Sequence, residues 1–132
     1  MTGIIREETR VPGLPTPLSH YTDAVRFGNL LFISGCAPVD EASNLVGIGD
    51  VTAQARQVLT HIGTVLRHVG ADFADVLKVT VYLLDADDRV AVNEVRKEFF
   101  GESRPASTLI EVRRLALTGM LVEIDAVAGI SG

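Results

Sequence analysis

The sequence contains no tryptophan and a single cysteine, Cys36, among its 132 residues. One cysteine cannot form an internal disulfide, and it excludes a metal site built from several thiolates. The absence of disulfides fits a reducing compartment, so we predict a cytoplasmic location. Aromatic side chains make up 5% of the residues. The stacked aromatic platforms that bind single-stranded nucleic acids are therefore scarce.

The chain also lacks a surplus of basic residues and a long hydrophobic run. Its formal net charge is −5, and among its lysines and arginines only Arg96-Lys97 and Arg113-Arg114 are adjacent. Phosphate binding requires clustered cations, and a transmembrane helix requires about 20 apolar residues. We therefore predict neither a nucleic-acid nor a membrane partner. The first ten residues carry acids rather than a basic and then an apolar segment, so no export signal is expected.

Aliphatic residues are abundant instead, because hydrophobic residues make up 47% of the sequence. A chain of this length is expected to form one domain, over residues 1–132, with a core that needs neither disulfides nor metal. In a short chain, this much apolar material predicts further surface that self-assembly hides.

Two helices are expected from the spacing of apolar residues. Asp50 occupies an N-cap position before a helix over 51–69, and Gly70 suits its end. The polar residues of this helix, including Gln54 and His61, are expected largely on the solvent side. A second helix is expected over about 87–100.

Six strands are predicted, over residues 4–9, 24–27, 30–34, 76–84, 107–112 and 121–127. Gly28-Asn29 is typical of a two-residue hairpin turn, and the consecutive apolar residues 30–33 predict a strand that is buried on both faces. In the strand over 76–84, Leu77 and Val79 are expected on one face and Lys78 on the other.

The element order β-β-β-α-β-α-β-β predicts an α+β, two-layer fold with both helices on one face of the sheet. The free face would carry Tyr82, Glu123 and Asp125 among apolar residues. Such a mixture suits a subunit interface that holds a buried polar site.

Seven segments, in this order and spacing, resemble the RidA/YjgF family. They are Ser34-Gly35-Cys36-Ala37-Pro38-Val39, Gln54–Leu59, Val69–Asp72, Asp75–Leu83, Val92-Asn93 before Phe99-Phe100, Arg104-Pro105-Ala106 and Val122–Ala128. The resemblance covers nearly the whole chain. It implies a chorismate-mutase-like fold and a homotrimer with inward-facing sheets and small-molecule clefts between subunits. It also implies hydrolytic deamination of small enamines or imines, such as 2-aminoacrylate, to 2-keto acids and ammonia, without a metal or organic cofactor.

The resemblance also assigns site residues. Tyr21, Gly35 and Asn93 match positions that line the family's pocket. Glu123, with Ser34, matches the groups that position the attacking water, which makes these two the candidate catalytic residues.

Three substrate-binding positions depart from the family pattern. Ser107 stands where the family has an arginine that grips the substrate carboxylate, Leu109 where a small thiol occurs, and Arg96 where a tyrosine is common. Because a hydroxyl cannot replace a guanidinium, the cleft is expected to favour neutral or cationic ligands, and the pKa of Glu123 is expected to rise. Entry of Arg96, Arg113 or Arg114 into the cleft would reverse this expectation.

Several interpretations stay open from the sequence. The chain is an imine deaminase, a hydrolase of a non-carboxylate substrate, or a non-catalytic trimer that binds a small metabolite. Ribonuclease activity or translation inhibition, described for some family members, is disfavoured by the acidic charge. Cys36 is a buried small hydrophobe or a reactive thiol. His20 is the histidine expected near the cleft, whereas His61 and His68 are expected in solvent.

Overall fold

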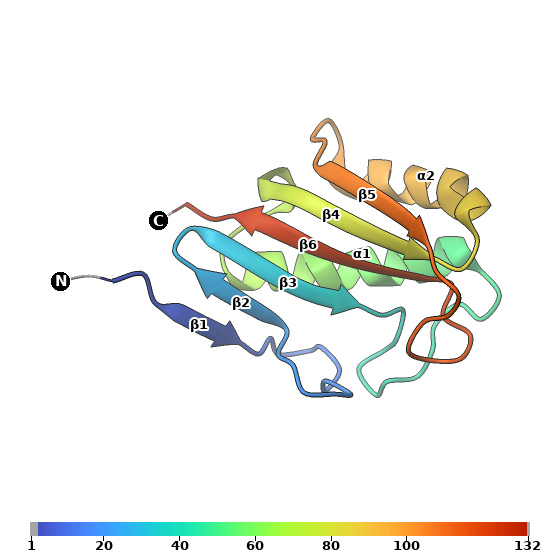
Figure 1. The fold of residues 1–132 in the computed structure, drawn as a ribbon, viewed down its shortest axis with the longest axis horizontal. Helices are drawn as coiled ribbons and strands as arrows, with labels where there is room; N and C mark the ends of the chain where they lie inside the picture. The colour runs from blue at the N-terminus through green and yellow to red at the C-terminus, as the bar shows by residue number, and fades with distance from the viewer. Residues whose placement is uncertain (1–2, 132) are drawn as a thin grey trace.

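The computed structural model describes residues 3–131, so residues 1, 2 and 132 of the predicted domain lie outside the described part. Six strands form one sheet in the order β1-β2-β3-β6-β4-β5, and both helices cover one face of it (Figure 1). The elements are β1 (Arg6–Thr9), β2 (Ala24–Phe27), β3 (Leu30–Cys36), α1 (Val51–His68), η1 (Phe73–Asp75), β4 (Val76–Leu83), η2 (Ala86–Asp88), α2 (Arg89–Phe100), β5 (Ala106–Glu111) and β6 (Val122–Gly129). The predicted α+β fold class and element order are confirmed.

Helix α1 begins and ends as expected, but its polar face is not wholly in solvent. The Asp50 side chain accepts a hydrogen bond from the backbone N–H of Ala53 at 3.1 Å, and Gly70 follows the helix with a φ of +79°. Gln54 and His61 are buried, so the expectation that they face solvent is wrong. Both side chains reach backbone groups of neighbouring loops, which allows a polar residue to stay in the core.

The fully buried Gln54 amide connects three segments. Its Nε2 donates to the carbonyls of Gly47 at 3.1 Å and Gly119 at 3.0 Å, and its Oε1 accepts from the N–H of Leu121 at 2.7 Å. The loop before α1 and the loop before β6 are therefore fastened to the same side chain.

The sheet is antiparallel except for the parallel β4–β5 pair. Gly28, at the predicted hairpin turn, has a φ of +63°, which a glycine adopts without strain. In β3, Leu31 and Ile33 are buried, whereas Phe32 is 47% exposed. In the single chain, the prediction that this strand is buried on both faces is therefore wrong, because the helices cover only one face of the sheet.

An irregularity in β4 overturns a second detail. The β4–β6 register shifts between Val76 and Lys78, so Val76 is buried and Leu77 is 51% exposed. Leu77 therefore does not share the buried face with Val79, as strict alternation would require.

Helix α2 begins at Arg89, two residues later than expected, because the 3-10 turn η2 precedes it. Val92 and Val95 are buried against the core, and the ring of Phe73 makes edge contacts with Phe99 and Phe100 at centroid distances of 5.5 and 5.1 Å. These contacts fix the C-terminal end of α2 beside η1.

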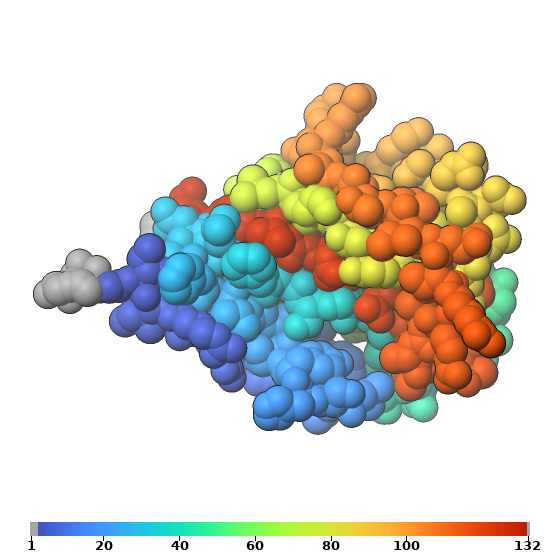
Figure 2. Space-filling model, viewed as in Figure 1, coloured from blue at the N-terminus to red at the C-terminus, as the bar shows by residue number. Residues whose placement is uncertain are grey.

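The opposite face of the sheet has no covering layer within the chain, and Figure 2 looks onto it. Tyr82, Glu123 and Asp125 lie there, as the sequence predicts, and Phe32 and Val127 lie beside them. We call this surface the open face. Among residues 3–131, no helix is long and apolar enough to cross a membrane, and no group of three or more metal-ligating side chains is placed to hold an ion.

Candidate functional site

A groove of about 300 Å³ opens at the end of the sheet where β3 and β6 meet two loops. Figure 2 shows this hollow between the blue segment before β2 and the orange segment before β6. Its lining residues are Leu18, Ser19, Tyr21, Ser34, Gly35, Ala37, Ala116, Leu117, Met120 and Glu123. Four of the predicted site residues are therefore brought together, namely Tyr21, Ser34, Gly35 and Glu123.

Gly35 is needed because the Glu123 carboxyl lies directly against it. A Cβ atom built on Gly35 would be 2.5 Å from Glu123 Oε2 and 3.0 Å from its Cδ. Real Cβ atoms essentially never approach another heavy atom this closely. Glycine at position 35 is thus the residue that lets the carboxyl lie on the backbone of β3.

The environment of Glu123 favours its protonated form. Burial raises the pKa of Glu123, and the neighbouring negative charge of Asp125 raises it further. Asp125 in turn accepts a hydrogen bond from the Tyr82 hydroxyl at 3.0 Å. No described basic side chain forms an ion pair with Glu123. The pKa of Glu123 is therefore shifted in the expected direction, but the causes within one chain are burial and Asp125 rather than the missing arginine.

The hydroxyl of Ser34 is already engaged within the chain. Ser34 Oγ donates to the backbone carbonyl of Thr22 at 2.6 Å, and its backbone N–H donates to the carbonyl of Asp23 at 3.0 Å. Ser34 thereby fastens the segment that carries Tyr21 to β3. Its oxygen can still accept a hydrogen bond from a ligand.

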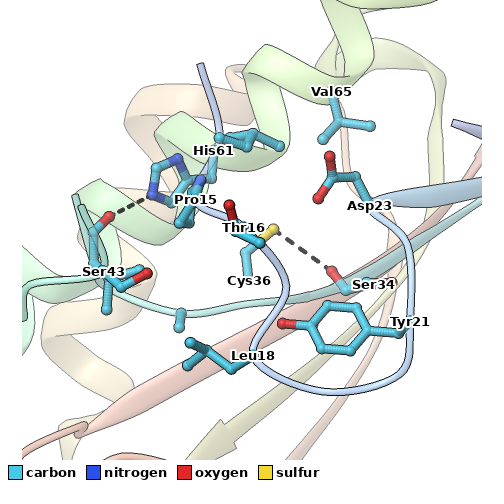
Figure 3. Close-up of a pocket in the computed structure, with 14 residues that line it drawn as sticks. Pro15, Thr16, Leu18, Tyr21, Asp23, Ser34, Cys36, Ser43, His61 and Val65 are labelled. Carbon is cyan, nitrogen blue, oxygen red and sulfur yellow. Dashed lines mark hydrogen bonds between the residues drawn. The ribbon is translucent and has the colours of Figure 1, made fainter. Parts of the chain in front are cut away.

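A smaller cavity of about 60 Å³ lies behind the groove, under the segment before β2 (Figure 3). It shares Leu18, Tyr21, Ser34, Gly35 and Ala37 with the groove, and its other lining residues include Asp23, Cys36 and His61. The histidine at this site is thus His61, whose Nε2 lies 2.6 Å from the carbonyl of Val39. His20 is exposed and lines neither cavity within one chain, although its neighbours Ser19 and Tyr21 line the groove, so its place near the cleft stays a prediction.

Cys36 has the environment of an unreactive thiol. Its Sγ contacts the carbonyl of Ser34 at 3.5 Å, and burial raises its pKa to about 12, with Asp23, Glu123 and Asp125 adding to the effect. A thiol that stays protonated at neutral pH is a poor nucleophile. Cys36 is partly buried and packs against the core, so of its two open interpretations the structure favours a small hydrophobic residue over a reactive thiol.

The remaining predicted site residues form a second group on the other side of the sheet. Asn93 and Arg96 line a groove of about 820 Å³ between α2 and the connection to β5. Arg96 Nη2 donates to Ser107 Oγ at 3.1 Å. Leu109 packs against the core.

Strand register explains why the two groups are separated in one chain. Ser107 pairs with Val79, which is buried beneath the helices, whereas Glu123 pairs with Tyr82 on the open face. Side chains of paired residues point to the same face of a sheet. Ser107 and Glu123 therefore face opposite sides. Arg113 and Arg114, considered as alternative cations, are exposed and line neither groove.

Sequence reasoning missed the loop residues that complete the first groove. Leu117 and Met120 line it from the loop before β6, and Met120 is fully buried although it lies outside any strand. An apolar residue just after Gly119 was an available signal, but spacing within a loop does not indicate which way its side chains point.

Comparison with known proteins places this geometry in a family. Residues 13–130 match the family model described as Endoribonuclease L-PSP. A RutC family protein of Pyrococcus horikoshii is 45% identical over 114 residues, which are 86% of this chain and 90% of that protein. The 2-iminobutanoate/2-iminopropanoate deaminase of Capra hircus is 38% identical over 128 residues, 97% of this chain and 93% of its own. The 3-aminoacrylate deaminase RutC of Acinetobacter baylyi is 38% identical over 116 residues, which are 88% of this chain and 91% of that protein.

Solved structures agree with the sequence comparison. The YjgF gene product of Escherichia coli superposes with a TM-score of 0.85 at 31% identity, covering 93% of this chain and 98% of that one. Escherichia coli TdcF with bound serine gives a TM-score of 0.84 at 29% identity, with coverage of 94% and 100%. The chain therefore belongs to the Endoribonuclease L-PSP family, which is the RidA/YjgF family that its sequence resembles.

Proposed function

We propose that this protein is a hydrolytic deaminase of small imines and enamines, which it converts to a carbonyl product and ammonia. The observation that carries the proposal is the Glu123 carboxyl, which lies against Gly35 in a groove and has a raised pKa. Two of the relatives are named as deaminases of 2-iminobutanoate/2-iminopropanoate and of 3-aminoacrylate. Their names support the same class of reaction here.

The chemistry needs one group that both accepts and donates a proton. Water adds to the imine carbon while Glu123 takes one of its protons. Glu123 gives this proton to the nitrogen, which leaves a tetrahedral intermediate with one hydroxyl and one amino group. Glu123 then takes the hydroxyl proton and passes it to the amino nitrogen, so that the C–N bond breaks and ammonia leaves as the carbonyl forms. A carboxyl group whose pKa is raised by burial is better suited to both transfers than one with an ordinary pKa. The Ser34 oxygen, which is free to accept, would bind the N–H of the substrate.

The proposed site lies between copies of the chain. The open face exposes Leu30 by 40%, Phe32 by 47% and Leu77 by 51%, and a contiguous apolar surface of this kind supports an interface. We propose a homotrimer in which these faces turn inward. The second group, Asn93 with Arg96 and Ser107, would then reach the Glu123 groove from a neighbouring copy.

Ammonia release tests the activity. The purified protein is mixed with 2-aminoacrylate that is generated in situ, and ammonia and keto acid are followed against buffer alone. We expect release well above the buffer rate, and a loss of at least about 100-fold in the Glu123→Gln variant. Release equal to buffer would refute the deaminase.

A non-catalytic, metabolite-binding trimer is the second candidate, because Ser107 replaces the family's arginine. It predicts thermal stabilisation by small metabolites without turnover. A hydrolase of non-carboxylate substrates would instead turn over neutral imines alone. The cytoplasmic location stays a prediction that rests on the single cysteine.

A further inference from the structure

Arg96 carries a positive charge that no described carboxylate neutralises. Arg56 pairs with Glu98 at 2.8 Å and Arg89 with Asp87 at 3.5 Å, whereas the half-buried Arg96 forms no ion pair with any residue in 3–131. Burial lowers the pKa of Arg96, but a guanidinium stays protonated at any physiological pH.

One hydrogen bond fixes the guanidinium and leaves most of its donors available. Arg96 Nη2 donates to Ser107 Oγ at 3.1 Å, and no other described residue accepts from this side chain. A guanidinium has five N–H donors in a planar fork that matches a carboxylate. Ser107 therefore holds the Arg96 guanidinium from one side, and the N–H donors on its other sides stay free for a ligand.

The groove around Arg96 is wide and has an excess of positive charge. Its lining includes the basic residues Arg96, Lys97 and Arg104 and the acidic residues Glu94 and Glu102. Lys97 and Glu94 form an ion pair at 3.0 Å. Two cations thus remain against one anion, in a chain whose net charge is −5.

We propose that Arg96, held by Ser107, binds the substrate's carboxylate, so that the substrates are small imino or enamino acids rather than neutral imines. In the family resemblance the carboxylate-binding arginine stands at the position of Ser107. Here the cation comes from α2, and its guanidinium lies 3.1 Å from the Ser107 oxygen. Asn93, three residues before Arg96 on the same helix face, lines the groove and presents an amide to the 2-imino group.

This assignment replaces the expectation that the cleft favours neutral or cationic ligands. It rests on the proposed function in one respect, because Arg96 of one copy must lie beside Glu123 of a neighbouring copy for the bound substrate to react. Binding of the carboxylate itself, however, needs no turnover and is measured separately.

Titration calorimetry with pyruvate, the product of 2-iminopropanoate hydrolysis, tests the assignment on the intact protein. Arg96→Leu should weaken pyruvate binding by about 10- to 100-fold, because it removes both the charge and the N–H donors. Arg96→Lys should weaken binding less, because lysine keeps the positive charge but cannot donate two parallel hydrogen bonds to the carboxylate. Adding Ser107→Arg to Arg96→Leu should restore binding, since it returns a guanidinium to the same place. Pyruvamide, which has no carboxylate, should bind the wild type and Arg96→Leu equally.

Arg56→Leu is the matched control, because it removes one positive charge from α1, outside the groove. It should leave pyruvate affinity within about twofold. An undetectable affinity of the wild type, an Arg96→Leu affinity within twofold of it, or a failure of Ser107→Arg to restore binding would overturn the assignment. If pyruvate binding depends on Arg96 but no ammonia is released, the deaminase proposal is refuted and the carboxylate site stands. If ammonia is released at the same rate with and without Arg96, the deaminase proposal stands and the carboxylate site is refuted.

Discussion

The close approach of Gly35 and Glu123 makes Gly35→Ala the most informative single change. The added Cβ would be 2.5 Å from Glu123 Oε2, and ordinary contact begins at 3.4 Å, so the carboxyl must move by about 0.9 Å (3.4 minus 2.5). A misplacement of about 1 Å in a reacting group costs on the order of 100-fold in rate. We expect kcat for ammonia release to fall by about that factor.

Stability should respond differently from activity. Gly35 does not have a positive φ, so alanine fits its backbone and restricts the unfolded chain, which contributes about 0.4–1 kcal/mol. The free energy of unfolding, measured by urea denaturation, should therefore stay within about 1 kcal/mol of the wild type.

Gly129→Ala is the control, because its Cβ would meet nothing closer than Leu77 Cδ1 at 3.4 Å, and its kcat should be unchanged. An unchanged kcat in Gly35→Ala, with Glu123→Gln inactive, would refute the argument that Gly35 places the carboxyl.

Three further predictions concern burial. Glu123→Gln should raise stability at pH 7. The folded pKa of Glu123 lies above the unfolded value of 4.5, so the contribution of Glu123 to stability is fully present below pH 4.5 and is lost as the pH rises through the folded pKa. The advantage of the variant should shrink toward zero in melts below pH 4.5, and an advantage that is independent of pH would contradict this. Gln54→Leu should cost about 3 kcal/mol in urea denaturation, because it removes three hydrogen bonds to part-buried backbone groups at about 1 kcal/mol each. Gln57→Leu, which loses one such bond, should cost less, and equal costs would refute the argument. Cys36, with a pKa of about 12, should react with iodoacetamide at pH 7.5 in urea far faster than in the folded protein. Rapid labelling of the folded protein would contradict the raised pKa.

Long periodic segments were predictable from the sequence, because burial of one face imposes their spacing. The helix that follows Asp50 and the hairpin at Gly28 formed where local signals placed them. Local periodicity failed where a distant partner decided the outcome. Gln54 and His61 look like solvent-side residues, yet they are buried because loop carbonyls, at Gly47 and Val39 among others, form hydrogen bonds with them.

The candidate site was predictable in part for the same reason. Tyr21, Ser34, Gly35 and Glu123 meet in one groove, as the family pattern implies. The contact between Arg96 and Ser107 joins two residues eleven positions apart on different elements, and no single-sequence pattern encodes the side-chain geometry that joins them. Placing the two groups in one cleft further requires knowledge of the assembly.

Complementation between two impaired variants tests the central claim, that each site combines groups from two copies. Glu123→Gln and Arg96→Leu are unfolded together and refolded as a mixture, and ammonia release is compared with each variant refolded alone. If Glu123 of one copy acts with Arg96 of its neighbour, random mixed trimers should restore about a quarter of the wild-type sites. A mixture no more active than the separate variants, although mixed trimers form, would contradict the account.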